Sequence, residues 1–206
     1  MEIKYKRPKL NIEYDMVAII DCLSQDERAQ FDQSDQIKLM LNNEEIPWKV
    51  FGCPSKAHLN QTLGLLAKFA REGKKVCLHF IAHGNQEGIE LAKRDFISWS
   101  ELRPLFTSLN EAMSGDLIVN MTTCQGLHGI KIVDLTGGSD QLFGIIGPKD
   151  ELTFVDAIDI NRRLFTYWIA GGDMAKIVER INQEMGREIL SCLSAEGYRG
   201  LKSDGA

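Results

Sequence analysis

Two short apolar segments stand out in the hydrophobic pattern, because each leads directly into a chemically reactive side chain. Residues 76–82 form a near-continuous apolar run that stops at His83-Gly84, and a second run begins at residue 117 and leads to Cys124. Apolar runs of this length are typical of strands buried on both faces of a parallel sheet. Ligands meet such sheets at the carboxyl ends of the strands. We therefore interpret the chain as a scaffold that brings these two strand ends together.

The remaining pattern alternates between strand and helix periodicity, which predicts an α/β fold containing βαβ units. Ser55 is a predicted N-cap, and Ser98 with Glu101 has the spacing of a capping box. The predicted elements are a strand at 16–21, a helix within 26–43, a strand at 48–52, a helix at 55–73, a strand at 76–82, a short hairpin strand at 88–91, a helix at 98–113, a strand from 117, a long loop at 125–142, a strand at 143–147 and helices at 155–170 and 175–185. We expect residues 1–14 to be an arm, Gly171-Gly172 to break a helix, and residues 187–206 to carry little regular structure.

Length and composition narrow the class of protein. The 206 residues show no internal repeat and no linker, so we predict one domain spanning residues 1–206. The net charge of −5 argues against a nucleic-acid partner, which requires a concentrated basic surface. No apolar stretch is long enough to span a bilayer, and the first residues lack the apolar core of a signal peptide. We therefore expect a cytoplasmic protein with neither a nucleic-acid nor a membrane partner.

The five cysteines are an odd number, widely scattered and without a CxxC pair. This argues against a disulfide framework or a zinc knuckle, and we expect no metal and no organic cofactor. Cys124 is the cysteine placed for chemistry, at a strand end between small polar residues and Gly126. The others are predicted to pack in the interior: Cys22, Cys53, Cys77 and Cys192.

A cysteine nucleophile needs a base and hydrogen-bond donors for the oxyanion, and the order of residues limits which base is available. A nucleophile elbow requires glycine two residues before the cysteine, where this chain has Thr122. A papain-like enzyme requires a distant later histidine, but the only later one is His128, four residues on. The base must come from the upstream histidines, His58, His79 and His83. Of these, only His83 ends a strand and precedes a glycine.

Apolar strand–His83-Gly84 followed by apolar strand–Cys124-Gln-Gly resembles the caspase-like cysteine peptidases. Their caspase signature is Q-A-C-[RQG]-G with histidine about 50 residues upstream; here Thr-Thr replaces Gln-Ala, and His83 lies 41 residues before Cys124. Residues 143–172 are most similar to the final strand and helix of CHAT and separase-type domains. The resemblance implies a three-layer α/β/α fold with a mostly parallel sheet. It also implies a cysteine endopeptidase of a bacterial defence or death pathway, with a protein substrate and a regulatory protein partner.

In such an enzyme Cys124 would attack the scissile carbonyl, His83 would transfer protons, and the backbone N–H groups of Gly84 and Cys124 would bind the oxyanion. The resemblance to separases, which cleave after arginine, suggests Asp156 as a carboxylate in the pocket for the preceding residue. Asp159 and Asp21 are weaker candidates for that pocket. The alternative for Asp156 is a helix N-cap, which would leave an apolar pocket.

Two other function classes stay open from the sequence. One is a catalytically inactive caspase-like domain that serves as an interaction module. The other is a flavodoxin-like ligand-binding or receiver domain, which requires a glycine-rich phosphate loop or clustered acidic residues after the first strand. Asp21 with Asp26 and Glu27 offers only a partial version of that cluster.

Overall fold

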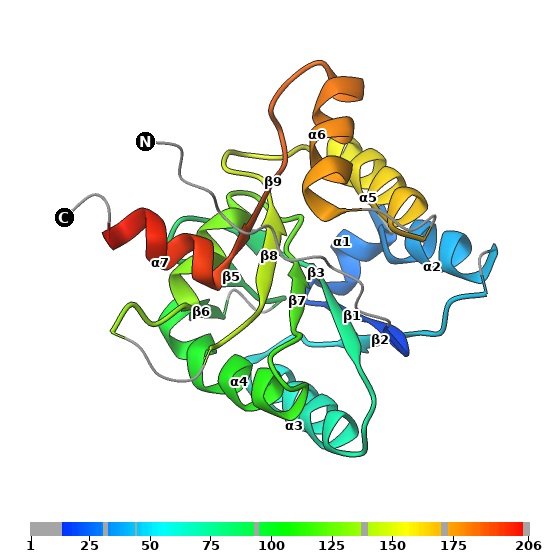
Figure 1. Cartoon of the computed structure of the whole chain (residues 1–206). Coiled ribbons are helices and arrows are strands. Elements are labelled where there is room, and N and C mark those ends of the chain that lie inside the picture. Colours follow the sequence, from blue (N-terminus) through cyan, green and yellow to red (C-terminus); the bar gives the residue numbers. More distant parts are fainter. Residues whose placement is uncertain are drawn as a thin grey trace.

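The centre of the structure, a computed structural model, is a six-stranded sheet in the order β2-β1-β3-β7-β8-β9 (Figure 1). The structure describes residues 14–30, 33–43, 45–92, 95–136, 140–169 and 173–203. The first five strands of the sheet order are parallel to their neighbours, and β9 pairs with β8 in the antiparallel direction. The strands are β1 (Met16–Asp21), β2 (Trp48–Gly52), β3 (Val76–Ile81), β7 (Ile118–Asn120), β8 (Gly144–Gly147) and β9 (Ser191–Ser194).

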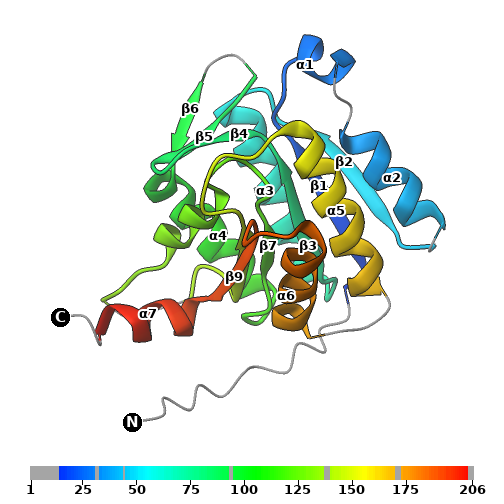
Figure 2. The same ribbon diagram turned by 90° about the horizontal axis from the view of Figure 1, so that it is seen from above.

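A second, smaller sheet follows β3 directly. Its three antiparallel strands are β4 (His83–Gly84), β5 (Gly88–Glu90) and β6 (Phe96–Ser98). Figure 2 shows this sheet and the short helix α1 (Gln25–Gln30) at the same end of the central sheet. That end is the carboxyl edge of the parallel strands, because β1 leads into α1 and β3 leads into β4. The candidate site lies there.

Helices cover both faces of the central sheet and give the predicted three-layer α/β/α fold. One face carries α3 (Lys56–Arg71) and α4 (Trp99–Ala112), and the other carries α2 (Gln33–Asn43), α5 (Phe154–Ile169) and α6 (Met174–Met185) (Figure 1). The sheet residues alternate between the two cores: Ala18 and Ile20 pack toward α3 and α4, whereas Val17 and Ile19 pack toward α2 and α5. This period of two is what an extended strand imposes.

Local signals in the sequence account for the helix ends. The Ser55 side chain accepts a hydrogen bond from the His58 N–H at the start of α3. Ser98 and Glu101 form the complete capping box at the start of α4. Pro104 lies in the second turn of α4, so the helix lacks the one N–H that would otherwise donate to the Ser100 carbonyl, and the first turn is held by the capping box instead.

Several predicted boundaries differ from the structure. The single helix expected within 26–43 is two helices, α1 and α2. The loop expected at 125–142 contains a 3₁₀ helix, η1 (Gly126–Ile132), and the C-terminal region forms β9 and α7 (Ala195–Ser203). Residues 1–13 of the predicted arm and the Gly171-Gly172 break lie outside the described residues, and the single-domain interpretation stays a prediction. None of the helices in the described ranges is both long and apolar enough to cross a bilayer.

Candidate functional site

His83 is held at the carboxyl edge of the sheet by two strands at once. The chain reaches it from β3, which is buried along its whole length, and β4 then pairs His83 with Glu90 and Gly84 with Ile89 of β5. The His83 side chain is 44% exposed. The histidine is therefore fixed through its backbone while its ring remains accessible to a substrate.

Gly84 lies directly against the backbone that carries the candidate nucleophile. A Cβ atom placed on Gly84 would lie 2.5 Å from the carbonyl oxygen of Cys124 and 2.6 Å from Oγ1 of Thr123. No side chain fits at that separation, so glycine is required by the close approach of the two backbones. The two strand ends that the sequence singled out do come together at this contact.

The loop after β7 presents Cys124 in a constrained backbone. β7 ends at Asn120, and Gln125 has a left-handed conformation with φ of 55°, which is uncommon for a residue with a side chain. The Gln125 N–H donates to the Asp150 carbonyl at 2.9 Å, and the Leu127 N–H donates to the Pro148 carbonyl at 2.9 Å. Two backbone hydrogen bonds to the segment after β8 therefore hold the turn that follows Cys124 in place.

The thiol of Cys124 contacts that same segment. The Leu152 N–H donates to Sγ at 3.4 Å, and the thiol can donate to the Leu152 carbonyl at 3.4 Å. Two residues later, the ring of Phe154 packs edge-on against the His83 imidazole, with the ring centroids 6.2 Å apart. Residues 152–154 thus contact both members of the predicted Cys–His pair, Leu152 through its backbone and Phe154 through its ring, and form one wall of the site.

His83 has a carboxylate partner from a distant part of the chain. Its Nε2 atom lies 2.6 Å from Oε1 of Glu27 on α1. Hydrogen bonds from Ser24 and then from His83 lower the pKa of Glu27 to about 2, although partial burial opposes this shift. Glu27 is therefore ionised at neutral pH, where its carboxylate only accepts hydrogen bonds.

A buried polar network anchors the Cys124 loop to α5. Thr122 Oγ1 donates to Asn161 Oδ1 at 2.8 Å, and Asn120 Nδ2 lies 3.3 Å from the same oxygen and 2.7 Å from Nδ1 of His79. Burial lowers the pKa of His79 to about 3, so this histidine is neutral. His79 is thus a structural residue whose hydrogen bond joins β3 to β7, and it does not face the candidate site as a base.

Each of the three acidic candidates for substrate recognition is engaged with an arginine of the chain itself. Asp21 is buried and pairs with Arg28 at 3.1 Å. Asp156 pairs with Arg187 at 2.7 Å. Asp159 pairs with two arginines one turn along α5, Arg162 at 2.6 Å and Arg163 at 3.0 Å.

The helix cap expected at Asp156 belongs instead to Thr153. The Asp156 N–H donates to Thr153 Oγ1 at 3.1 Å, and the Thr153 hydroxyl donates to Oδ2 of Asp156 at 2.8 Å. Asp156 is therefore the acidic residue inside the first turn of α5, where it suits the positive end of the helix dipole. Hydrogen bonds from Thr153 and Arg187 lower its pKa.

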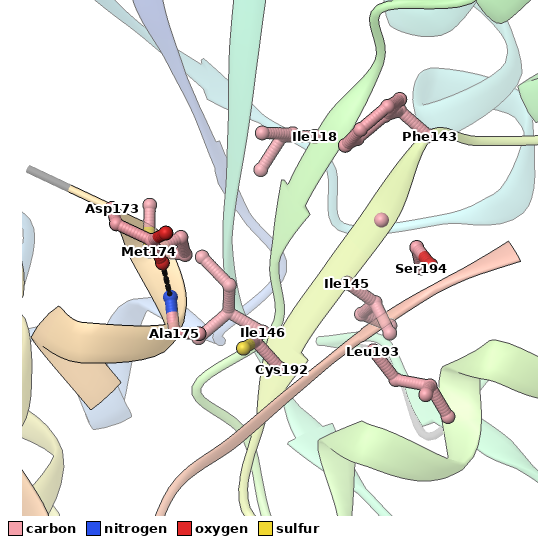
Figure 3. A pocket seen from close by; sticks show the side chains of 11 residues that line it. Ile118, Phe143, Ile145, Ile146, Asp173, Met174, Ala175, Cys192, Leu193 and Ser194 are labelled. Atoms are coloured by element: carbon pink, nitrogen blue, oxygen red, sulfur yellow. Dashed lines mark hydrogen bonds between the residues drawn. The ribbon is translucent and has the colours of Figure 1, made fainter. Parts of the chain in front are cut away.

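The remaining cysteines lie away from this site. Cys22, Cys53 and Cys77 are buried, and burial raises the pKa of each thiol. Cys192 is partly exposed on β9 and lines an apolar cavity of about 190 Å³ between β8, β9 and the start of α6 (Figure 3). That cavity contains neither His83 nor Cys124 among its lining residues. Within the described ranges, no group of three His, Cys, Asp or Glu side chains is arranged to hold a metal ion.

The sequence interpretation did not assign Glu27, Phe154 or Asn161 to the site. A signal for Glu27 was present, because Ser24 and Glu27 have the spacing of a capping box directly after β1. Its contact with His83 follows only from the pairing of β1 with β3, which the sequence does not specify. No comparable signal identifies Asn161, which is one polar residue in an amphipathic helix.

Comparisons with known proteins bear on the fold. No protein-family model matches the sequence, and no curated protein matches it. The crystal structure of drICE, a caspase, aligns with a TM-score of 0.54 and 10% sequence identity over 92% of this chain and 91% of drICE. The ABC domain in complex with L-Trp from Streptococcus pneumonia aligns with a TM-score of only 0.36 and 12% identity over 84% of this chain and 52% of its own, too low to carry an argument. The likeness to drICE shows that this chain has a caspase-like three-layer fold.

Proposed function

We propose that this protein is a cysteine endopeptidase in which Cys124 is the nucleophile and His83 transfers protons. The observation that carries the proposal is the contact of Gly84 with the Cys124 backbone, which leaves no room for a side chain between the two strand ends. The wall at residues 152–154 supports it, because Leu152 contacts the thiol and Phe154 contacts the imidazole. The caspase-like fold supports it further, since the order of histidine and cysteine along the chain is the one that the resemblance requires.

In the proposed reaction, His83 takes the thiol proton and the Cys124 sulfur bonds to the scissile carbonyl carbon. The carbonyl electron pair moves onto oxygen, where the backbone N–H groups of Gly84 and Cys124 donate to it. The imidazolium then passes its proton to the amide nitrogen as the C–N bond breaks, and the amine leaves. Water attacks the resulting thioester, gives its proton to His83, and the thiol is restored as the new carboxyl product departs.

The finer assignment within the caspase-like peptidases is to CHAT and separase-type domains. It rests on the strand–helix order of residues 143–169 and on the aromatic face of α5, whose Phe165 and Trp168 rings stack 6.1 Å apart. This assignment also carries the proposed role in a defence or death pathway and the expectation of a regulatory protein partner. A protein substrate follows from the proposed reaction itself.

The two alternative functions differ in what they require of the molecule. An inactive interaction module has the same fold but no reactive thiol at position 124. A flavodoxin-like domain shares the strand order 2-1-3-4-5 with the first five strands of this sheet. The antiparallel strand β9 and the small sheet β4–β6 depart from that plan, and the structural likeness is to a caspase.

The proposed specificity is for a basic residue before the scissile bond, with Asp156 as its partner. A substrate arginine would replace Arg187, whose side chain is 56% exposed, and could form two parallel hydrogen bonds with the carboxylate. Phe154, two residues earlier, contacts His83, so this end of α5 lies beside the reacting groups. If Asp156 instead stays paired with Arg187, Phe154 beside His83 would favour a substrate that has an apolar residue before the scissile bond.

A peptide library cleaved by the wild-type protein and by Asp156→Asn tests both the activity and its specificity. We expect the wild type to cleave after basic residues and Asp156→Asn to lose at least about tenfold of that preference, the loss typical of a paired charge. Asp35→Asn, which removes an exposed carboxylate paired with Lys38 on α2, should cleave like the wild type. Apolar preference in all three proteins would overturn the basic pocket, and no cleavage by any of them would favour the inactive module.

A further inference from the structure

The contact between Glu27 and His83 joins two parts of the chain that are 56 residues apart. Glu27 lies on α1, which follows β1, and His83 lies just beyond β3. β1 and β3 pair along their whole length, with Asp21 opposite Ile81 at the carboxyl edge. The sheet therefore delivers the carboxylate and the imidazole to the same place, with 2.6 Å between Oε1 and Nε2.

Glu27 is held from a second side as well as from His83. Its Oε2 atom accepts the Ser24 N–H at 2.7 Å, and its own N–H donates to Ser24 Oγ at 3.3 Å, which completes a capping box. The neighbouring Arg28 fixes the same turn, because it pairs with Asp21 and donates to the Leu23 carbonyl at 2.7 Å. One carboxylate oxygen thus anchors the helix while the other faces His83.

This arrangement determines which nitrogen of His83 carries the proton. An ionised carboxylate only accepts hydrogen bonds, so Nε2 must be the donor in a contact of 2.6 Å. In the neutral imidazole the lone pair then resides on Nδ1, the nitrogen that can accept a proton. Phe154 packs edge-on against the ring and limits its rotation.

We propose that Glu27 is a positioning residue for the Cys–His pair, which holds His83 with Nδ1 directed toward Cys124 and stabilises the imidazolium. The inference rests on the proposed peptidase function and adds a carboxylate to the two residues assigned above. When the thiol ionises, its proton moves from Sγ of Cys124 to Nδ1 of His83. The Nε2 proton stays on the ring, and Glu27 remains ionised throughout.

Glu27→Gln tests this role, because glutamine keeps the length of the side chain and suits the same capping position but carries no charge. We expect kcat for peptide cleavage to fall by about 10- to 100-fold with KM little changed, at or below the usual contribution of acid–base catalysis because His83 itself is retained. We also expect the pH at which iodoacetamide alkylation of Cys124 is half-maximal to rise by about one unit, because an opposite charge close to a titrating pair shifts it by this amount or more.

Two further variants separate positioning from structural support. Ser24→Ala weakens the cap but leaves the Glu27 charge in place, so it should lower the unfolding temperature without moving the alkylation midpoint. Glu179→Gln removes an exposed carboxylate on α6 and should change neither property. An unchanged midpoint and an unchanged kcat in Glu27→Gln, with cleavage intact in the wild type, would overturn the role of Glu27 alone.

A measurement on the unmodified protein does not depend on any variant folding. The ¹⁵N chemical shifts of the His83 ring at neutral pH should report the tautomer with the proton on Nε2. The tautomer with the proton on Nδ1 would overturn the inference, whatever the outcome of the cleavage assay. Conversely, the Nε2 tautomer in a protein that cleaves no peptide would mean that the contact exists and that the peptidase proposal has failed.

Discussion

Cys124→Ala should lower kcat/KM for peptide cleavage by at least about 10³-fold, because the acyl intermediate of the proposed reaction forms on the Cys124 sulfur. The fold should persist, since Cys124 is only partly buried and its thiol makes two long contacts with Leu152 at 3.4 Å. Cys192→Ala is the matched control, because Cys192 is also partly exposed but lines the separate cavity on β9.

The measurement is steady-state cleavage of a peptide that the wild type accepts, with circular dichroism as a check of folding. Cys124→Ala should be inactive and folded, and Cys192→Ala should retain wild-type kcat/KM. Cleavage by Cys124→Ala at the wild-type rate would show that another residue performs the reaction. Equal losses in both variants would point to a general effect of removing a thiol.

Gly84→Ala should reduce kcat/KM by about 100-fold, the loss expected when reacting groups are misplaced by about 1 Å. The added methyl would meet the Cys124 carbonyl oxygen at 2.5 Å and Thr123 Oγ1 at 2.6 Å. Because one of these atoms belongs to the backbone, the contact cannot be relieved by a side-chain rotation. Either β4 or the Cys124 loop must shift, and both carry groups of the proposed site.

Gly64→Ala provides the control for this prediction. Gly64 is exposed on α3, and a Cβ placed on it meets no atom within 4 Å. Alanine there should leave cleavage unchanged and raise the free energy of unfolding by up to about 1 kcal/mol, through its higher helix propensity. If Gly84→Ala cleaves as well as Gly64→Ala, the close approach of the two strand ends is irrelevant to activity.

The central strands, and the strand ends that carry His83 and Cys124, could be predicted from the sequence because burial leaves a strong pattern. β3 is buried on both faces over six residues, and this is why the apolar run before His83 is continuous. The capping boxes and N-caps are equally local signals, and those at Ser55 and Ser98 were predicted correctly. Not every local signal was assigned correctly, because the cap of α5 lies at Thr153 and not at Asp156.

Most of the other errors arose where the determinant is not local. β9 was missed because its Ser-Cys-Leu-Ser sequence is half-buried on every residue and owes its pairing to β8. Glu27 was missed because its partner depends on which strand lies beside β1. The arginine partners of Asp21, Asp156 and Asp159 were also not predicted, although Arg162 and Arg163 lie within one turn of Asp159.

The most direct test of the central claim, that His83 activates Cys124, is the rate of iodoacetamide labelling at each cysteine near neutral pH, mapped by mass spectrometry. A thiol beside a base reacts through its thiolate, and reactivity follows the thiolate fraction. We predict that Cys124 labels at least about tenfold faster than Cys192 in the wild type and that His83→Ala removes most of this difference. Equal labelling of Cys124 and Cys192, or a Cys124 rate that is the same in His83→Ala, would contradict the account.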